Sequence, residues 1–224
     1  MKYTKILPES FRNKHGSRWN ELNLMLRIIW AKIMREFVRP PLPKLDGGSV
    51  NLHLGCGPIN HAMFINIDIV PLPHIHYVRY IDDLSPFGDN SVSLIYACHC
   101  LEHFSHARLS AVLSEWYRVL KEDGILRLSV PDFDLLLDVY HENGKDINTI
   151  VQPVMGGQGN KYDFHKSLFN GSSLRVLLKD VGFRDVQEWH PGSSELTTFD
   201  DWSAKPMVLN GKDYPLSLNI EAIK

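Results

Sequence analysis

A helical stripe of apolar residues dominates the first fifty positions. Apolar side chains recur there at intervals of three and four residues, which places them on one face of a helix over residues 19–38. The stripe consists of Leu22, Met25, Leu26, Ile29, Ile33, Met34 and Phe37. Three prolines from Pro40 to Pro43 end the helix, because proline has no amide proton to donate. We therefore expect an amphipathic helical arm and linker in residues 1–48, ahead of a domain in residues 49–224.

Strand-like and helix-like runs alternate through the rest of the chain. Strands are expected at Val50–Leu54, Met63–Ile69, Tyr77–Ile81, Val92–Ala97, Ile125–Val130, Asp185–Trp189 and Leu216–Ile223. A helical stripe from Leu109 to Leu120 is expected to end at Gly124. A second helix is expected over 173–181, closed by Gly182. This alternation predicts an α/β fold with a mostly parallel seven-stranded sheet and helices on both of its faces.

Charge is distributed unevenly between the arm and the domain. Residues 1–50 hold ten Lys or Arg and four Asp or Glu, a net of +6, which leaves 14 basic and 22 acidic residues, a net of −8, in the rest. The overall charge of −2 gives no reason to expect a nucleic acid partner. The basic helix has three open interpretations: a lid packed on its own domain, a dimer contact, or peripheral contact with a membrane surface.

Cysteine usage and the lack of long apolar runs bear on the compartment. The three cysteines are an odd set, and Cys98 and Cys100 are too close in sequence for an unstrained disulfide. We expect a reduced, cytoplasmic protein. No run reaches the roughly 18 to 20 apolar residues that a spanning helix needs, and residues 1–14 lack the apolar core of a secretory signal.

A glycine turn follows the first expected strand directly. Gly55-Cys56-Gly57 stands where open α/β sheets bind nucleotide-like ligands, since glycine lets a ligand approach backbone N–H groups closely. Asp68 lies eleven positions after Gly57, where a second strand ends and an acid can accept both ribose hydroxyls. A dinucleotide-binding fingerprint needs a third glycine and an acid about 20 residues after the glycine turn. This chain has Asn60 instead of the third glycine, and its acid comes much sooner. A nucleoside site is therefore favoured, with a plain tight turn as the alternative.

Five blocks between Val50 and about Tyr140 resemble those of class I S-adenosylmethionine-dependent methyltransferases, in particular the group called type 11. The blocks are NLHLGCG at 51–57, DDLSPF at 82–87 with DNSV at 89–92, HCLEHF at 99–104, EWYRVLK at 115–121 with Gly124, and SVPD at 129–132. They stand in the family's order. The resemblance implies a Rossmann-like domain, S-adenosylmethionine as the cofactor and methyl transfer to a small molecule.

The resemblance also implies roles for individual residues. The glycine turn passes under the methionine and ribose portions of the cofactor, Asp68 binds the ribose diol, and an acid at 82 or 83 frames the adenine together with Leu84. The expected cofactor-binding residues are Gly55, Cys56, Gly57, Asp68, Asp82, Asp83, Leu84 and His99. For the acids at 82 and 83, a solvated loop position or a helix cap is the alternative. Pro58, Asn60 and the short span to Asp68 depart from the family and predict a truncated first crossover.

A general base helps methyl transfer only when the acceptor must lose a proton, because the sulfonium is already activated. The catalytic candidates are His103, His165 and Asp132, each of which also has a purely structural interpretation.

The segment from His99 to His103 has two metal-binding interpretations. Its H-x-x-E-H pattern is that of inverted zincins, but a zincin carries both histidines on one long helix, whereas this segment directly follows an apolar strand. The segment also resembles a Glu-x-x-Glu-His motif with which some ribose-hydroxyl methyltransferases, using a later histidine, hold a divalent metal. Here the set is His99, Glu102, His103 and, as the later histidine, His165. Hydrogen bonds that order the loop are the alternative, so whether a metal takes part is unknown.

Two late segments are expected to shape the acceptor pocket. They are the glycine-rich run 155–160 and the acidic, aromatic run Asp200–Ser203. Carboxylates and a tryptophan suit hydroxylated acceptors such as sugars. The expected function is methyl transfer to such a hydroxyl. The alternatives are a catalytically silent cofactor-binding domain that acts through a partner, and a metal-dependent hydrolase using the His99, Glu102 and His103 set. The acceptor atom and the oligomeric state stay undetermined.

Overall fold

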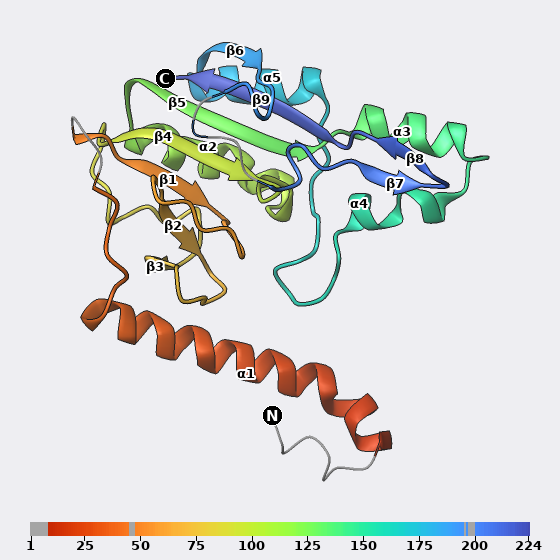
Figure 1. The fold of residues 1–224 in the computed structure, drawn as a ribbon, viewed down its shortest axis with the longest axis horizontal. Coiled ribbons are helices and arrows are strands. Elements are labelled where there is room, and N and C mark those ends of the chain that lie inside the picture. The colour runs from red at the N-terminus through yellow and green to blue at the C-terminus, as the bar shows by residue number, and fades with distance from the viewer. Residues whose placement is uncertain (1–8, 45–47, 195, 197–199) are drawn as a thin grey trace.

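A seven-stranded sheet organises the chain, in the order β3-β2-β1-β4-β5-β9-β6 (Figure 1). The computed structural model describes residues 9–44, 48–194, 196 and 200–224, with only the backbone for 9–19. The strands are β1 Asn51–Leu54, β2 Ile65–Asp68, β3 Tyr77–Val78, β4 Val92–Cys98, β5 Leu120–Pro131, β6 Arg184–Glu188 and β9 Ser217–Ile223. Strands β1 to β5 pair in parallel, and β9 runs antiparallel between β5 and β6. The predicted mostly parallel α/β fold is confirmed.

The strand β5 starts earlier than the sequence pattern predicts. The helix α2 spans Leu109–Val119 and stops at Leu120, whose backbone is already extended. The prediction that this helix ends at Gly124 is therefore wrong. Gly124 lies inside β5, where a Cβ would come within 2.7 Å of the carbonyl oxygen of Lys121. The glycine serves a tight bend in the strand, next to Asp123 in a left-handed conformation.

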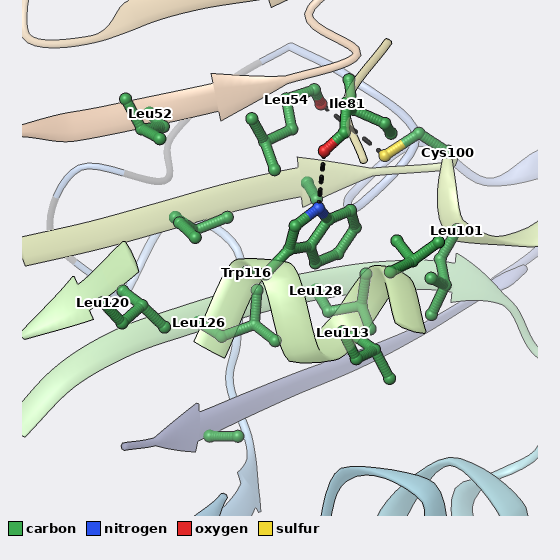
Figure 2. Close-up of a cluster of buried hydrophobic side chains, with 14 of the residues drawn as sticks. Leu52, Leu54, Ile81, Cys100, Leu101, Leu113, Trp116, Leu120, Leu126 and Leu128 are labelled. Atoms are coloured by element: carbon green, nitrogen blue, oxygen red, sulfur yellow. Dashed lines mark hydrogen bonds between the residues drawn. The ribbon is translucent and has the colours of Figure 1, made fainter. Parts of the chain in front are cut away.

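The main hydrophobic core lies between the sheet and two helices, α2 and α5. Helix α5 spans Gly171–Val181 and ends, as predicted, at a left-handed Gly182. Figure 2 shows Trp116 of α2 at the centre of this core, with its indole N–H donating to the carbonyl of Ile81 at 2.7 Å. The indole is fully buried, so this bond satisfies its one polar atom. Helix α2 is thereby fixed against the segment that follows β3.

Loop residues cover part of the opposite sheet face. Phe64, Leu94, Tyr96 and Trp189 form a second buried cluster there. The Tyr96 hydroxyl donates a hydrogen bond of 2.6 Å to Asp201, which is itself buried. This bond fixes the segment that follows β6 against β4.

The crossovers from β1 to β2 and from β2 to β3 contain no helix, which confirms the predicted truncation. Helix α1, Glu9–Phe37, instead packs against this end of the sheet (Figure 1). Its Ile28 is buried with Cys56 of the glycine turn and with Ile75 and Val78. Large apolar side chains on the far side of α1 are exposed: Leu22, Leu26, Ile29, Trp30, Ile33 and Phe37.

Arg35 of α1 binds the loop between β2 and β3. Its guanidinium donates to the carbonyl oxygens of Ile75 at 2.8 Å, Leu72 at 3.2 Å and Pro73 at 3.1 Å. His74 in the same loop contacts the carbonyl oxygen of Gly57 at 3.0 Å through Nε2. The helix therefore helps to order the loop that supports the glycine turn.

The remaining elements lie beyond the end of β5. They are α3 Phe133–Glu142, α4 Val151–Met155 and a hairpin of β7 Met207–Leu209 with β8 Lys212–Tyr214, none of which the sequence pattern predicts. The predicted linker 44–48 lies partly outside the described residues. Within the described part of the chain, no helix combines the length and apolar character needed to cross a membrane.

Candidate active site

The glycine turn lies at the point where the sheet order changes direction, with β1 between β2 and β4. Gly55 and Gly57 both have left-handed backbones, with φ of 63° and 52°. A Cβ on Gly55 would lie 2.9 Å from Cβ of Cys100, whereas one on Gly57 would meet no atom within 4 Å. Close packing therefore requires the first glycine. The second faces open space at the carboxyl end of β1.

Asp68 at the end of β2 is bound to this turn. The backbone N–H of Gly57 donates to its Oδ2, and that of Val70 donates to its Oδ1, each at 2.8 Å. Burial raises the pKa of this carboxyl above its ordinary value. The two oxygens of a carboxylate offer about four acceptor sites, so this one can also accept from a ligand hydroxyl. Cys56, between the two glycines, is buried under α1.

The other predicted cofactor residues after β3 have protein partners. Asp82 accepts a hydrogen bond of 2.5 Å from Arg108, and the more exposed Asp83 pairs with Arg79 at 3.1 Å. Leu84 is fully buried in the main core, and its N–H donates to Glu115 at 3.0 Å. An adenine-framing role for these residues stays a prediction.

A pocket of about 440 Å³ opens beyond the ends of β4 and β5. Its lining brings together three segments that are far apart in the sequence. These are His99 and His103 after β4, the segment 152–165 with Asp163 and His165, and Trp202 with the β7 region. Two of the predicted catalytic residues, His103 and His165, thus face one pocket together with His99.

Burial favours the neutral form of the three histidines of this pocket. Burial lowers the pKa of His99 to about 3 and also lowers the pKa values of His103 and His165. The rings of His103 and His165 lie 4.9 Å apart, centroid to centroid. Neutral imidazoles can accept a proton or bind a cation.

Glu102 lies beneath these histidines with its side chain only 1% exposed. Its Oε1 is 3.6 Å from Nδ1 of His99 and 3.8 Å from Nε2 of His165. Neither carboxylate oxygen has a hydrogen-bond partner among the described residues. Burial raises the pKa of this carboxyl to about 8.

Asp132, the third catalytic candidate, lies at the start of α3. It is the N-cap residue of that helix, and its Oδ1 accepts a hydrogen bond of 3.0 Å from the N–H of Asp134. It does not line the pocket that His103 and His165 share. A catalytic role for Asp132 stays a prediction.

The acidic residue that lines the pocket, Asp163, was not among the site residues expected from the sequence. Asp163 lines the pocket, and its Oδ2 accepts a hydrogen bond of 3.0 Å from the N–H of Gly159. A Cβ on Gly157 would lie 2.7 Å from this oxygen, which accounts for the glycine-rich run. Asp201 instead points inward to Tyr96 and Ser203. Only Trp202 of its segment lines the pocket.

A model of the methyltransferase domain family matches residues 67–128, which include β4, α2 and the expected adenine and His99–His103 regions. The predicted resemblance to methyltransferases is confirmed. A curated glycine/sarcosine N-methyltransferase of Aphanothece halophytica is 32% identical over 99 residues. This similarity covers 37% of this chain and 37% of that enzyme, so the chain spans little more than a third of its length.

Two solved methyltransferase structures were compared with this fold. A SAM-dependent methyltransferase from Archaeoglobus fulgidus superposes with a TM-score of 0.50 at 19% identity, covering 97% of this chain and 100% of that one. A Burkholderia thailandensis 1,6-didemethyltoxoflavin-N1-methyltransferase gives a TM-score of 0.49 at 15% identity. The superposition covers 96% of this chain and 84% of that one. The first of these likenesses supports the class I methyltransferase fold.

Proposed function

We propose that this protein transfers the methyl group of S-adenosylmethionine to a small molecule. The observation that carries the proposal is the pairing of Gly57 with Asp68 at the point where the sheet order changes direction. Gly57 faces open space, and the Asp68 carboxylate can accept more hydrogen bonds than those from Gly57 and Val70. These features fit a ligand with a ribose diol. When bound, the cofactor supplies a methyl group already activated on a sulfonium.

The cofactor claim is tested without knowledge of the acceptor. Calorimetric titration with S-adenosylhomocysteine is expected to show binding that Asp68→Ala weakens by roughly tenfold or more. Asp180→Ala is the matched control, because Asp180 is an exposed acid on α5. Binding that is absent from the folded wild-type protein, or unchanged in Asp68→Ala, would contradict the proposal. Binding without turnover on any acceptor pool would favour the silent-domain alternative.

We further propose a hydroxyl acceptor, on a sugar or related metabolite. The pocket beside β4 offers an exposed Trp202 ring to cover a sugar face, and Asp163 and neutral histidines to bind hydroxyl groups. Transfer forms a C–O bond, breaks the C–S bond of the sulfonium and releases the hydroxyl proton. The histidine nitrogens can take that proton directly or hold a cation that makes the hydroxyl more acidic.

An acceptor screen with methyl-labelled cofactor tests the hydroxyl proposal. Matched pools of polyols and sugars, of amines, and of apolar aromatics are expected to give labelled product in the first pool only. Trp202→Ala is expected to raise KM for the acceptor while leaving S-adenosylhomocysteine affinity unchanged. Product from amines alone would overturn the hydroxyl acceptor but leave methyl transfer in place.

A reduced compartment such as the cytoplasm is part of the proposal. All three cysteines are free, and Cys56 and Cys100 are buried. Thiol titration of the native and the urea-unfolded protein, purified without reductant from cytoplasmic expression, is expected to find three free thiols only after unfolding. A disulfide in that preparation would contradict it.

For the exposed side of α1 we propose contact with an anionic membrane surface. Trp30 and Phe37 are 65% and 80% exposed, opposite the side that buries Ile28. Residues 20–44 carry five Lys or Arg against two Asp or Glu; Arg35 and Arg39 contact the domain, which leaves the other three to attract anionic headgroups.

Vesicle sedimentation tests the membrane proposal. The full chain is expected to sediment with vesicles containing phosphatidylglycerol and much less with pure phosphatidylcholine. Trp30→Ser with Phe37→Ser is expected to abolish this binding, whereas Val208→Ser, an exposed apolar residue of β7, preserves it. A dimer that depends on Trp30, with no binding to vesicles, would overturn the proposal.

A further inference from the structure

Glu102 is a buried carboxylate surrounded by electron-pair donors. It lies on the short turn Leu101–His103 after β4, and neither oxygen has a hydrogen-bond partner among the described residues. A buried charged group without a partner is costly, and such groups in proteins are paired or bind metals. The kind of group that Glu102 binds can therefore be inferred from the protonation of the atoms around its Oε1.

The tautomers of His103 and His165 follow from their backbone contacts. Nδ1 of His103 lies 3.1 Å from the carbonyl oxygen of Phe164, and Nδ1 of His165 lies 2.9 Å from that of Pro153. A carbonyl only accepts, so each Nδ1 carries the proton; Nε2 of His165 then presents a lone pair, while the ring of His103 also contacts the backbone of His99. Histidines that ligate metals have their second nitrogen held in this way.

His99 presents a third lone pair to the same carboxylate. The Ser217 hydroxyl donates to the carbonyl oxygen of Trp202 at 2.6 Å, so it accepts a hydrogen bond from Nε2–H of His99 at 2.7 Å. Nδ1 of His99 is then unprotonated, and it lies 3.6 Å from Oε1 of Glu102. Neither oxygen of Glu102 has a hydrogen-bond partner among the described residues, so the cluster is completed either by a proton on Glu102, whose pKa burial raises, or by a bound cation.

Backbone hydrogen bonds join the segment that carries Glu102 to the segment that carries His165. The N–H groups of Lys166 and Ser167 donate to the carbonyl oxygen of Glu102 at 2.8 and 3.2 Å, and the Ser167 hydroxyl donates to that of Phe104 at 2.7 Å. His165 is therefore fixed beside Glu102 although 63 positions separate them. The arrangement does not depend on flexible side chains.

We propose that Glu102, His103 and His165 bind one divalent transition-metal ion at the floor of the pocket. One ligand atom from each lies within 4.8 Å of the others. With bonds of about 2.0–2.2 Å, three ligand atoms in a facial or tetrahedral arrangement lie roughly 3.0–3.6 Å apart, so loading has to draw the three together by about an ångström. Two histidines and one carboxylate leave coordination positions open toward the pocket, as in catalytic zinc and non-haem iron sites.

Metal binding is independent of methyl transfer, whereas the role of the ion rests on the proposed function. Both histidine ligands line the pocket assigned above to the acceptor. An ion on them would lower the pKa of a hydroxyl that enters the pocket and fix its orientation. The proton of that hydroxyl then leaves to solvent as the C–O bond forms. Acceptors that already carry a free lone pair, such as amines, gain nothing from this ion.

The experiment uses the full chain, stripped with EDTA and freed of any affinity tag. Titration with Zn²⁺, and with Co²⁺ followed by its visible absorption, is expected to show one ion bound per chain. Glu102→Gln and His165→Asn are expected to weaken this binding by roughly a hundredfold or more, because altering even the groups that orient metal ligands costs about 10- to 100-fold. His106→Ala is the matched control, since His106 is exposed just after the cluster. Circular dichroism and urea unfolding confirm that each variant is folded.

The outcomes separate this proposal from the proposed function. No stoichiometric binding to the folded wild-type protein, or unchanged binding in Glu102→Gln, would overturn the metal site and indicate that Glu102 keeps a proton instead. Metal binding without any affinity for S-adenosylhomocysteine would leave the metal site in place, overturn the methyltransferase proposal and favour the hydrolase alternative.

Discussion

Gly57 and Asp68 are joined by a hydrogen bond of 2.8 Å from the backbone N–H of the glycine to Oδ2 of the acid. The carboxylate that ends β2 therefore holds the turn that follows β1. Because Val70 donates to the other oxygen, the carboxylate orientation is fixed from both sides. A ligand that binds here meets an ordered acid and an ordered turn.

The open space beside Gly57 gives a first prediction. Gly57→Ala is expected to lower the free energy of unfolding by about 1–2 kcal/mol, because alanine is strained in a left-handed conformation. It is also expected to weaken S-adenosylhomocysteine binding by roughly tenfold, because the new methyl group occupies ligand space. Gly192→Ala is the control, since Gly192 also has a positive φ and a Cβ there would meet no atom within 4 Å. Calorimetry and urea unfolding measure both quantities, and equal ligand affinity in the two variants would contradict the prediction.

The contact between Arg35 and the β2–β3 loop gives a second prediction. Arg35→Ala is expected to lower the free energy of unfolding by roughly 1.5–3 kcal/mol, because three backbone carbonyls lose a charged donor. It is also expected to weaken S-adenosylhomocysteine binding, because His74 of this loop contacts Gly57. Arg27→Ala, an exposed change on the same helix, is expected to do neither. Wild-type stability in Arg35→Ala would show that α1 does not support the site.

Glu115 gives a pH-dependent prediction. Its hydrogen bonds from Arg118 lower its pKa, and the N–H of Leu84 also donates to it. A carboxyl whose pKa is lower in the folded state contributes stability above its unfolded pKa of about 4.3 and loses it as the pH falls through the folded value. Glu115→Gln is therefore expected to cost about 1 kcal/mol at pH 7 and less at a pH of about 3, below the unfolded pKa. Urea unfolding at both pH values measures this, with the more exposed Glu122→Gln as control. A cost that does not vary with pH would refute the assignment.

The buried pair of Tyr96 and Asp201 gives a fourth prediction. Tyr96→Phe removes a donor from a carboxylate that also accepts from the N–H and the hydroxyl of Ser203. The expected loss in the free energy of unfolding is about 1–3 kcal/mol. A double-mutant cycle with Asp201→Asn is expected to show coupling, because the two changes remove the same bond. Strict additivity would mean that this bond does not hold the segment in place.

Local patterning was enough to predict most of the main sheet. Apolar runs indicated its strands, and Gly182 marked the end of α5 because its left-handed conformation suits glycine. Gly124 gave the wrong end for α2, since the same residue type also serves bends inside strands. The β7–β8 hairpin could not be predicted because its strands are only three residues long and carry little periodic signal.

Short-range spacing along the chain was sufficient to predict the fold class, the glycine turn with its acid, and the residue types that suit a nucleoside site. The periodicity of strands and helices converts such spacing directly into position, so no distant contact has to be known. The folded chain alone reveals that His165 lies beside Glu102, that Asp201 points inward, and that Asp163 supplies the acid of the pocket. Such pairings depend on how loops pack across the ends of different strands, and no local periodicity encodes that packing.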